Sequence, residues 1–402
     1  MGYYAVNIII DAFQILLFVI SVFYLGVSLF SLFPFKYKAP KDKYNKFAVV
    51  IPAHNEEGVI KTALLSLKQQ SYPKELFKVF VMADFCTDKT AQEAIEYGAV
   101  VLSRTTDKTS KGMALSDAFA QIVDFESDTD AFVVIDADNA VDSNFLFEIN
   151  LMMQQGYSVV QGYVDALNPS ESWVSYAYAM WYWITNRIAQ IGFCRLGLNC
   201  KINGTGFAVS IDVLDNVLWN VESLAEDIEY TAKLGLNNIR ISYAPKAVVY
   251  DKKPKSFKAS VKQRKRWARG NIFVLKKYFL KLLRIGHFSD LFMLISDFMM
   301  PLCWIFFLIV DFIAIMNLAS ITHNSLFLLW INPLNLFLLN IYVFGTLFAV
   351  ICGLLTDKKL SAKFLLNIFG FIIYILSWIP ITILGMISIK DKSWYHTEHK
   401  NI

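Results

Sequence analysis

The chain has 402 residues, of which 55% are hydrophobic and 18% are charged, and it contains 33 Phe, 19 Tyr and 9 Trp. This apolar and aromatic excess exceeds that of an average soluble protein and gathers at the two ends of the chain. The net charge of +4 reflects lysines beside the apolar runs, so it gives no argument for nucleic acid as a partner. The five cysteines have neither paired nor metal-ligand spacing, which predicts free thiols.

The first apolar run covers residues 5–33, and Asp11 and Gln14 are among its few strongly polar residues. It has no small-residue cleavage site and exceeds the apolar core of a signal peptide, so residues 1–35 are predicted to form a retained transmembrane helix. Five lysines follow between positions 36 and 46. The excess of positive charge on cytoplasmic loops therefore predicts a cytoplasmic central domain in a multi-pass protein of the plasma membrane.

Three further apolar stretches, at about 291–321, 326–355 and 364–389, predict C-terminal transmembrane helices within residues 291–389. Three full crossings would leave the tail 390–402 outside the cell, although its lysines favour the cytoplasm. We therefore expect one stretch, around Pro301 or Pro333, to lie flat or to re-enter the membrane.

In the central domain, residues 36–253, short apolar runs typical of strands alternate with segments that have the apolar spacing of helices. Short apolar runs at 46–53, 77–84, 99–104 and 131–138 predict strands, and segments 56–70, 89–98 and 112–123 predict helices. This alternation is typical of an α/β fold with a mostly parallel sheet covered on both faces. Ligands of such sheets bind beyond the carboxyl ends of the strands.

Acidic side chains stand at those strand ends: Glu56 and Glu57, then Asp84 with Asp88, then Asp136 and Asp138. Gathered carboxylates repel one another unless a cation or hydrogen-bond donors satisfy them, and oxygen ligands suit Mg²⁺ or Mn²⁺. Such an ion commonly bridges phosphate oxygens, so a nucleotide diphosphate is the expected ligand. Two simpler readings stay open: Glu56, Glu57 and Asp88 as helix caps, and the Asp-x-Asp pair as a cap of the turn before residues 142–151.

Seven segments in a fixed order resemble membrane-integrated family 2 glycosyltransferases, the group of the cellulose, chitin, hyaluronan and poly-N-acetylglucosamine synthases. The segments, which span about residues 46–271, are VVIPAHNEE, VMADFCTDKT, KGMAL, DADN, NGTGF, AEDIEYTAKL and QRKRWARG. Each is weakly specific by itself, but their order is specific. The resemblance implies a GT-A-type, Rossmann-like catalytic domain inserted between N- and C-terminal transmembrane helices.

The resemblance also implies a role for each matching residue. Asp227, with Glu226, would supply the general base, and Asp138 with Asp136 would bind Mg²⁺ or Mn²⁺. The nucleotide sugar, a UDP-sugar, would contact Pro52, His54, Asn55, Glu56, Asp84, Lys111, Asp136, Gln263, Arg264, Arg266 and Trp267. The acceptor would contact Gly204, Thr205, Gly206 and Trp267. The tail segment WYHTEH resembles a mobile lid, with Trp394 and Thr397 over the nucleotide.

Two segments bear on the acceptor and the membrane. In residues 172–197, Trp173, Tyr176, Met180 and Trp183 fall at helical spacing, which is typical of a core or interfacial helix; a sugar-stacking surface is the alternative. Residues 254–290 form a basic amphipathic region that carries the QRKRW motif, so we expect it to lie on the inner leaflet. The family's usual Thr-Glu-Asp is Ala225-Glu226-Asp227 in this chain, which removes a hydroxyl beside the acceptor.

The expected function is inverting transfer of a sugar from a nucleotide-diphosphate sugar to a growing β-linked polysaccharide, with possible coupled export. The expected partners are the nucleotide sugar, a glycan or glycolipid acceptor and membrane lipid. Single addition of a sugar to a membrane lipid is the alternative. A non-catalytic scaffold would lack the metal aspartates or the base, and a transporter would carry more charges within its apolar segments than this chain does.

Overall fold

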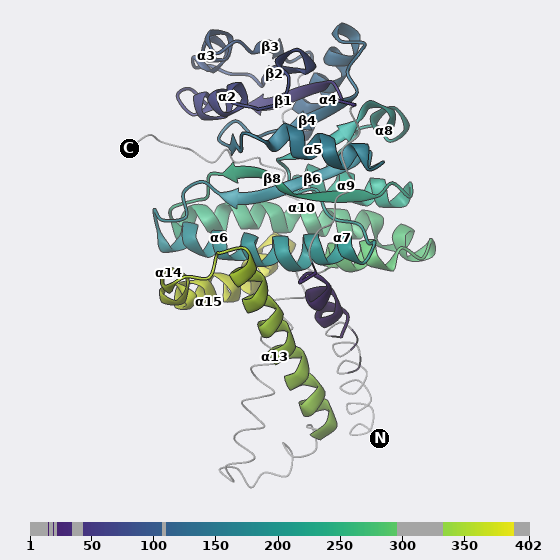
Figure 1. The fold of residues 1–402 in the computed structure, drawn as a ribbon, viewed down its shortest axis with the longest axis vertical. Coiled ribbons are helices and arrows are strands. Elements are labelled where there is room, and N and C mark those ends of the chain that lie inside the picture. The colour runs from purple at the N-terminus through teal and green to yellow at the C-terminus, as the bar shows by residue number, and fades with distance from the viewer. Residues whose placement is uncertain are drawn as a thin grey trace.

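In the computed structural model, residues 22–33, 43–106, 110–295 and 333–389 are described, together with Ile15 and Val19. Its centre is an eight-stranded sheet with the order β3-β2-β1-β4-β7-β6-β8-β5 (Figure 1). The strands are β1 Phe47–Ala53, β2 Phe77–Ala83, β3 Val100–Ser103, β4 Ala131–Val134, β5 Ala140–Val141, β6 Val159–Ala166, β7 Phe207–Ser210 and β8 Ile241–Asp251. The four strands predicted from the sequence are β1 to β4.

Helices cover both faces of this sheet, as the alternation of patterns predicts. The helices of the domain are α2 Ile60–Lys68, α3 Thr90–Glu96, α4 Lys111–Phe125, α5 Phe145–Gln154, α6 Trp173–Thr185, α7 Phe193–Arg195, α8 Ile211–Asn216, α9 Glu226–Leu236 and α10 Phe257–Arg284, with the 3₁₀ turn η1 Lys74–Leu76 and the π-helical segment η2 Asn186–Gly192. In β1, Ala48 and Val50 enter the core shared with α4, α6 and α9, whereas Val49 and Ile51 enter the core shared with α2, α3 and α5. Successive side chains of a strand point to opposite faces, so one apolar strand supplies both cores.

The sheet is mixed rather than mostly parallel, which corrects the sequence-based prediction. β1, β2, β3 and β4 pair in parallel, as do β6 and β8, but β7 runs antiparallel to both β4 and β6. β5 is also antiparallel to β8. Because β7 reverses direction, its first residue, Phe207, pairs with the last residue of β4, Val134. The loop before β7 is thereby brought to the edge where β4 ends.

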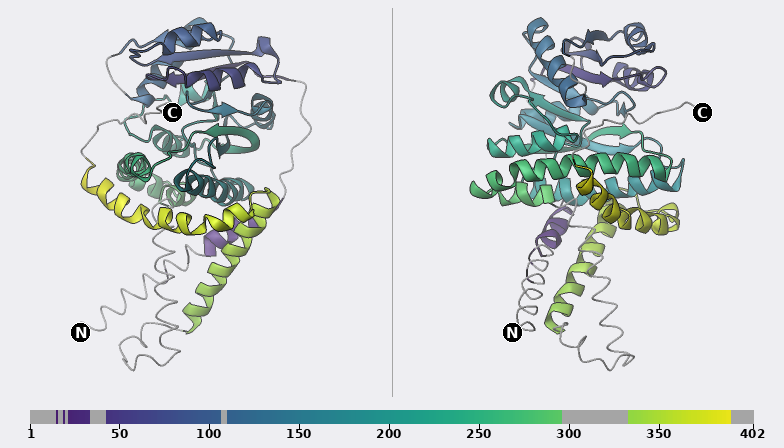
Figure 2. Two further views of the ribbon diagram at one scale, coloured as in Figure 1. Left: turned by 90° about the vertical axis from the view of Figure 1, so that its left-hand side faces the viewer. Right: turned by 180° about the vertical axis from the view of Figure 1, so that it is seen from behind.

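A second group of helices lies beneath the domain: α13 Pro333–Thr356, α14 Ala362–Leu366, α15 Ile368–Leu376 and α16 Trp378–Ile387. Figure 2 shows α14 to α16 running across the base of the domain, while α13 projects away from it. α15 packs along α6 and α16 packs along α10. α10 also packs along α9, so it lies between α9 and α16. α16 therefore covers part of residues 254–290, the segment predicted to lie on the inner leaflet.

One arginine connects three separate parts of the chain at this base. Arg187, in η2, forms a bidentate ion pair with Asp357, just after α13. Its Nη1 also donates to the backbone oxygen of Ser31, 3.1 Å away, at the end of the N-terminal helical segment. Arg187 is 8% exposed, so these contacts are largely shielded from water. An unpaired guanidinium would be costly there, and the joint fixes how both apolar segments meet the domain.

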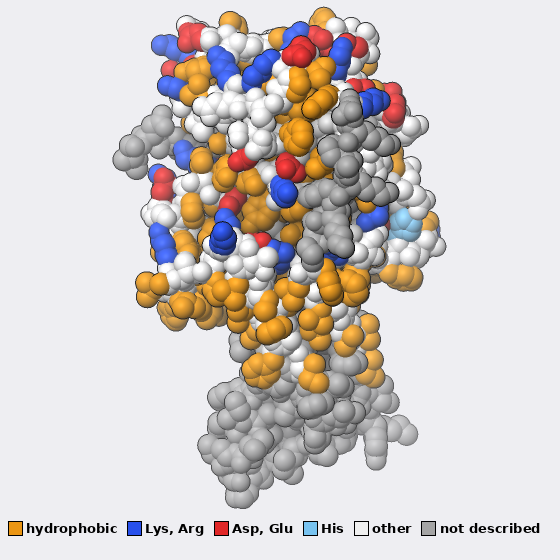
Figure 3. All heavy atoms as spheres, in the orientation of Figure 1, with side chains coloured by type: hydrophobic (Ala, Val, Ile, Leu, Met, Phe, Trp, Pro, Cys, Tyr) orange, Lys and Arg blue, Asp and Glu red, His pale blue; other side chains and the backbone are white. Residues whose placement is uncertain are grey.

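Among the described residues, one apolar run is long enough to cross a membrane by length and composition: Ile368–Ile387, with 20 residues, mean hydropathy 2.1 and 22% burial. Phe344–Thr356 is a shorter apolar helix. Apolar side chains gather over the base of the domain and over α13, whereas charged side chains lie above them (Figure 3). Most of the predicted run 5–33, the stretch 296–332 with Pro301, and the tail with Trp394 and Thr397 lie outside the described residues, so the crossings stay predictions.

Candidate active site

A cavity of about 250 Å³ lies between the carboxyl ends of β1, β2 and β4 and the helices α6, α9, α10 and α16. Most side chains that the sequence singles out line it, although they come from separate parts of the chain. These are Pro52, His54, Glu56, Asp84, Lys111, Asp136, Asp138, Gly204, Thr205, Glu226, Asp227, Gln263, Arg266 and Trp267.

Of the predicted site residues within the described ranges, three do not line this cavity. Asn55 adopts a left-handed φ of 55°, and its Oδ1 accepts from the backbone N–H of Thr87 at 2.8 Å, which ties the loop after β1 to the loop after β2. Gly206 has a φ of +65°, and a Cβ there would lie 2.4 Å from Cγ1 of Val249. Arg264 is fully buried elsewhere, as described below. Asn55 and Gly206 therefore shape the loops around the site.

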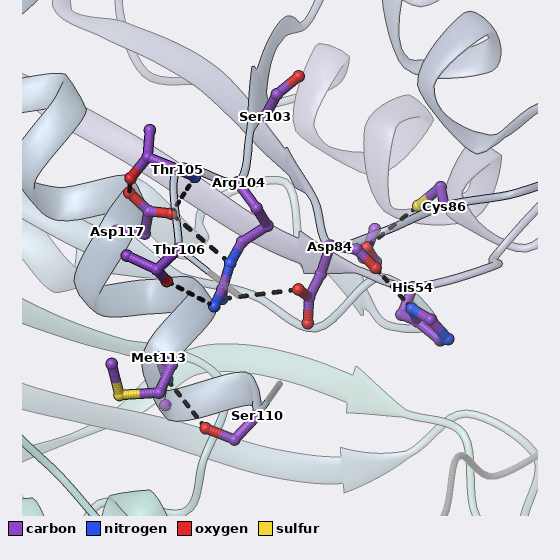
Figure 4. Close-up of polar contacts among 12 residues, drawn as sticks. His54, Asp84, Cys86, Ser103, Arg104, Thr105, Thr106, Ser110, Met113 and Asp117 are labelled. Atoms are coloured by element: carbon purple, nitrogen blue, oxygen red, sulfur yellow. Dashed lines mark hydrogen bonds and ion pairs between the residues drawn. The ribbon is translucent and has the colours of Figure 1, made fainter. Parts of the chain in front are cut away.

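Asp84 marks one end of the cavity and forms a buried ion pair. Arg104 Nη1 lies 3.5 Å from Asp84 Oδ1, and Arg104 Nε lies 3.5 Å from Asp117 Oδ2 (Figure 4). Asp117 is held in turn by the backbone N–H of Thr105 at 2.7 Å. Burial raises the pKa of Asp84, while Arg104 and His54 oppose this rise. The sequence shows no signal for Arg104, which follows β3 and is aimed at Asp84 by the fold.

Asp88, by contrast, has the simpler role that the sequence leaves open. Its carboxylate accepts from the backbone N–H of Thr90 at 3.0 Å and from that of Glu57 at 3.0 Å. It therefore orders the start of α3 and the loop after β1. These contacts confirm the structural reading of Asp88.

Lys111 links three walls at the centre of the cavity. Its Nζ lies 2.5 Å from Asp136 Oδ1 and 3.5 Å from Glu226 Oε1, and it donates to the carbonyl oxygen of Gly204 at 2.9 Å. Burial raises the pKa of Asp136 to about 6, against the opposing effect of Lys111. Burial disfavours the charged form of Lys111, but Asp136 and Glu226 outweigh it and raise the Lys111 pKa. This lysine therefore stays charged.

Asn139, in the turn after β4, connects the Asp-x-Asp pair to a further carboxylate, that of Asp251. With its side-chain nitrogen facing the acids, Asn139 donates to Asp138 Oδ1 at 2.9 Å and to Asp251 Oδ1 at 3.1 Å, and its oxygen accepts from Thr205 Oγ1 at 2.7 Å. Asp251, at the end of β8, also lines the cavity. No signal in the sequence points to Asp251, because its strand reaches the site by pairing with β6, which is distant along the chain. Thr205 is 2% exposed and mainly orders this turn.

Asp138 and Asp136 fit a divalent cation by the chemistry of their oxygens. Mg²⁺ and Mn²⁺ sites commonly use one or two carboxylates, and substrate phosphates and waters complete the shell. Asp251 adds negative charge nearby, and burial raises its pKa. Within the described residues, no group of three or more His, Cys, Asp or Glu side chains has the arrangement of a complete metal site. The two aspartates alone would therefore be a partial ligand set.

Asp227 lies in the first turn of α9, opposite the loop before β7. A Cβ placed on Gly204 would be only 3.3 Å from Asp227 Oδ2, so this glycine allows the loop to approach the carboxylate. Burial raises the pKa of Asp227 to about 7, and the neighbouring Glu226 adds to this rise. Lys111 and Lys201 oppose it. A carboxyl with a pKa near 7 exchanges protons readily at physiological pH.

Ala225, which stands where the family usually has threonine, lies next to another hydroxyl, that of Ser223. Ser223 Oγ accepts from the Ala225 backbone N–H at 3.0 Å and donates to the carbonyl oxygen of Gly270 at 3.1 Å. A Cβ on Gly270 would lie 2.6 Å from the Cβ of Ala225, so α10 passes very close to the start of α9. A small residue at each position permits this approach, and Ser223 supplies a hydroxyl two residues earlier in the chain.

The QRKRW motif divides between the cavity and the helices beneath it. Gln263 Oε1 accepts from Tyr178 Oη at 2.9 Å, and Arg266 Nη1 donates to the Leu224 carbonyl oxygen at 3.2 Å. Arg264 instead donates from Nη1 to the Tyr374 carbonyl oxygen at 3.0 Å and to Ser377 Oγ at 2.8 Å. Its exposure is 0%. Its predicted contact with the diphosphate is therefore not supported by its position; it holds the junction of α15 and α16.

α6 presents two aromatic faces with different surroundings. Tyr176, Met180 and Trp183, part of the face noted in the sequence, are buried in the core, which agrees with the default reading of that pattern. The other face places three side chains in the cavity wall: Trp181, Tyr182 and Thr185. Trp378 of α16 joins this wall. Trp378 is not predicted as a site residue from the sequence, because it lies in an apolar run that predicts a membrane helix.

Comparisons with known proteins agree with this geometry. The model of the family "Glycosyltransferase like family 2" matches residues 45–270. The chain is 26% identical to the probable glycosyltransferase YdaM of Bacillus subtilis over 388 residues, which cover 91% of this chain and 90% of the relative. It is 22% identical to a poly-beta-1,6-N-acetyl-D-glucosamine synthase of Staphylococcus epidermidis, with coverages of 85% and 81%.

Two further similarities are more limited. A beta-monoglucosyldiacylglycerol synthase of Nostoc sp. is 26% identical over 237 residues, which cover 56% of this chain and 48% of the relative. The solved structure of the mannosyltransferase PcManGT from Pyrobaculum calidifontis, in complex with GDP-Man and Mn²⁺, aligns with a TM-score of 0.56 at 15% identity and covers 86% of this chain and 98% of that one. This likeness shows a GT-A-like α/β fold. The chain belongs to glycosyltransferase family 2 and is a glycosyltransferase.

Proposed function

We propose that the protein is an inverting transferase that moves a sugar from a nucleotide-diphosphate sugar, a UDP-sugar, to a hydroxyl of a growing β-linked polysaccharide. One observation carries this proposal: Asp84, Asp138 and Asp227, which are far apart in the sequence, line one cavity. Asp84 is at the end of β2, Asp138 follows β4, and Asp227 begins α9. In this proposal, Asp84 would serve the nucleoside, Asp138 the diphosphate and Asp227 the acceptor.

The donor would lie along the strand ends. Asp84, paired with Arg104, would accept hydrogen bonds from the nucleoside, next to the backbone of Pro52 and His54. Lys111 would stabilise negative charge on the diphosphate, and Arg266 would approach the same group from α10. A cation held by Asp138 and Asp136 would neutralise charge on the departing phosphate. The side chains of this wall would hold the donor in place before the bond breaks.

The acceptor hydroxyl would be activated from α9. Asp227 would take the hydroxyl proton as the acceptor oxygen bonds to the anomeric carbon of the donor sugar. The bond from that carbon to the phosphate oxygen would break, and the nucleoside diphosphate would leave with the bonding electrons. Attack opposite the leaving group inverts the anomeric centre. An α-linked donor would give a β-linked product.

A lipid acceptor is a second candidate, favoured by two observations. The Nostoc relative is named for synthesis of a monoglucosyl lipid, although the match covers 48% of it. Exposed apolar side chains also gather on α14 to α16 beneath the cavity, including Leu366, Phe369 and Ile387 (Figure 3). This surface and the projecting α13 favour a membrane location. Both acceptors are compatible with the same chemistry.

The test uses the purified full chain with Mn²⁺ and four donors: UDP-glucose, UDP-N-acetylglucosamine, UDP-galactose and GDP-mannose. Nucleotide release is measured with and without acceptor, and products are analysed by mass. We expect release from one UDP-sugar and a series of products that differ by one sugar unit. A single addition to diacylglycerol would favour the second candidate. Failure to consume any donor would contradict the proposed function.

A further inference from the structure

Lys253 lies behind the part of the cavity wall that carries the Asp-x-Asp pair. It is the second residue after β8, and only 3% of it is exposed. Its Nζ forms an ion pair with Oδ2 of Asp251, the last residue of β8, and lies 3.4 Å from the centre of the Tyr182 ring. Asp251 and Tyr182 line the cavity, whereas Lys253 does not. The lysine therefore influences the cavity through these two side chains and through its charge.

The position of Lys253 is fixed by the groups around it. Asn168, which is 8% exposed, accepts from the backbone N–H of Lys253 at 2.7 Å and donates to its carbonyl oxygen at 2.9 Å. A cation over an aromatic face is attracted to it, and the attraction strengthens where water is excluded. A buried charge also requires a partner, because an unpaired one is costly. The ammonium group is thus held between Asp251 and Tyr182.

The other oxygen of Asp251 connects this ion pair to the predicted cation ligands. Asn139 is fully buried and donates to Asp251 Oδ1 at 3.1 Å and to Asp138 Oδ1 at 2.9 Å. Thr205 Oγ1 donates to the Asn139 side chain at 2.7 Å and accepts from the backbone N–H of Asp136 at 3.1 Å. A continuous set of contacts therefore runs from the buried ammonium group to both residues of the Asp-x-Asp pair.

The two carboxylates that neighbour Asp138 are each paired with a lysine. Lys111 Nζ lies 2.5 Å from Asp136 Oδ1, and Lys253 pairs with Asp251. Without these lysines, three carboxylates would repel one another and also the diphosphate of a donor. The two pairs therefore limit the negative charge that the strand-end wall presents to a nucleotide.

We propose that Lys253 is a positioning residue for the cation site; this rests on the proposed function for the place of the cation and the diphosphate. Lys253 holds Asp251 against Asn139 and balances its charge, so that Asp251 orients the turn of the Asp-x-Asp pair without being a ligand of the cation. Both Asp251 oxygens are already bonded, one to the lysine and one to the amide. A pair that merely joined β8 to α6 would not set the affinity of the cavity for ions.

A second ion pair of the same kind lies outside the cavity and provides a matched control. Asp165 belongs to β6, which pairs in parallel with β8. Lys359 Nζ lies 2.6 Å from Asp165 Oδ2 and 5.1 Å from the ring centre of Trp183 in α6. None of these three side chains lines the cavity. Lys359→Met therefore breaks a comparable ion pair without changing the charge of the cavity wall.

The test measures the binding of two probes to the full chain by calorimetry: Mn²⁺ alone, and UDP with EDTA. We expect Lys253→Met to bind Mn²⁺ about fivefold more tightly and UDP about fivefold more weakly, because an unbalanced carboxylate attracts the cation and repels the anion. Asp251→Asn should show the opposite signs. The double variant, which removes both charges, should return both affinities to within about twofold of the wild type. Lys359→Met should leave both unchanged.

Several results would overturn the inference. Weaker binding of both probes by Lys253→Met would indicate a general structural defect. An Mn²⁺ affinity as low in the double variant as in Asp251→Asn would make Asp251 a direct ligand. Equal changes in Lys359→Met and Lys253→Met would assign the effect to the loss of any such ion pair. If Lys253→Met does not fold, the comparison of Asp251→Asn with the double variant decides.

This test and the test of the proposed function fail separately, because no sugar transfer is measured here. If the wild type consumes no donor but the variants show the opposed changes for Mn²⁺ and UDP, only the proposed function fails. If a donor is consumed and the opposed changes are absent, only the role of Lys253 fails.

Discussion

The two walls of the cavity differ in how they are built and in what holds them. The strand-end wall carries Asp84, Lys111, Asp136 and Asp138 on short loops after β2 and β4 and at the start of α4. The helical wall carries Trp181, Trp267 and Trp378 on α6, α10 and α16, which are packed together by side chains distant in sequence. The first wall follows from local order along the chain, whereas the second exists only after the helices have docked. Charge is concentrated in the first and aromatic surface in the second.

The largest expected effect lies between the two walls, at Asp227. We predict that Asp227→Asn lowers transfer by about a thousandfold or more, because an amide cannot take the proton of the hydroxyl. UDP affinity, measured by calorimetry, should remain within about threefold. Asp212→Asn is the control, because Asp212 also lies in the first turn of a helix but is exposed, outside the cavity. Transfer at the wild-type rate in Asp227→Asn would show that Asp227 is not the general base.

At the strand-end wall, Asp138→Asn should lower activity by about a hundredfold and weaken Mn²⁺ binding by about ten- to a hundredfold. The reason is that a neutral amide oxygen attracts a divalent cation less than a carboxylate does. Isothermal titration with Mn²⁺ and UDP gives the affinity, and chelation by EDTA should abolish activity reversibly. The exposed Asp215 provides the control variant Asp215→Asn. Equal Mn²⁺ affinity in Asp138→Asn and the wild type would be inconsistent with the assigned ligand.

A tenfold effect per pH unit is expected from the titration of Asp227. Its folded pKa of about 7 is raised mainly by burial, so the carboxyl is protonated below pH 7 and cannot act as a base. We predict that kcat/KM falls about tenfold for each unit below pH 7, whereas nucleotide affinity changes much less. A profile of kcat/KM that stays flat from pH 7 to pH 5 would show that the base titrates elsewhere.

These outcomes also show which parts of the molecule the sequence can predict. Strand and helix periodicity predicts β1 to β4 and α2 to α4, and the acids at the strand ends predict Asp84, Asp136 and Asp138 as site residues, because these signals are short-range. The other site residues, such as Lys111 and Asp227, are expected only from the resemblance to the family. Three features cannot be predicted from the sequence: the antiparallel direction of β7, the ion pair of Arg104 with Asp84, and the position of Asp251 beside the Asp-x-Asp pair. Each depends on pairing or packing between distant segments. The position of Trp378 in the cavity wall could not be predicted for another reason. An apolar run has the same sequence pattern whether it crosses a membrane or packs on α10.

The smallest expected effect on activity comes from Arg264, behind the helical wall. Arg264→Met should lower activity by only about threefold, since the guanidinium lies outside the cavity, but should destabilise the α15–α16 junction by about 2 kcal/mol because Tyr374 O and Ser377 Oγ lose a charged donor. Limited proteolysis near Ser377 measures the opening of this junction. Lys265→Met, at the next position, is the control. A hundredfold loss of activity with no change in proteolysis would instead return Arg264 to the diphosphate.

The most direct test of the account is the anomeric configuration of the product. The proposed reaction is a single displacement, in which Asp227 takes the proton while the charged wall holds the leaving nucleotide. Proton NMR of the first product formed from an α-linked UDP-sugar reports the anomeric configuration of the new glycosidic bond. We expect a β-linked product, and an α-linked product would contradict a single displacement.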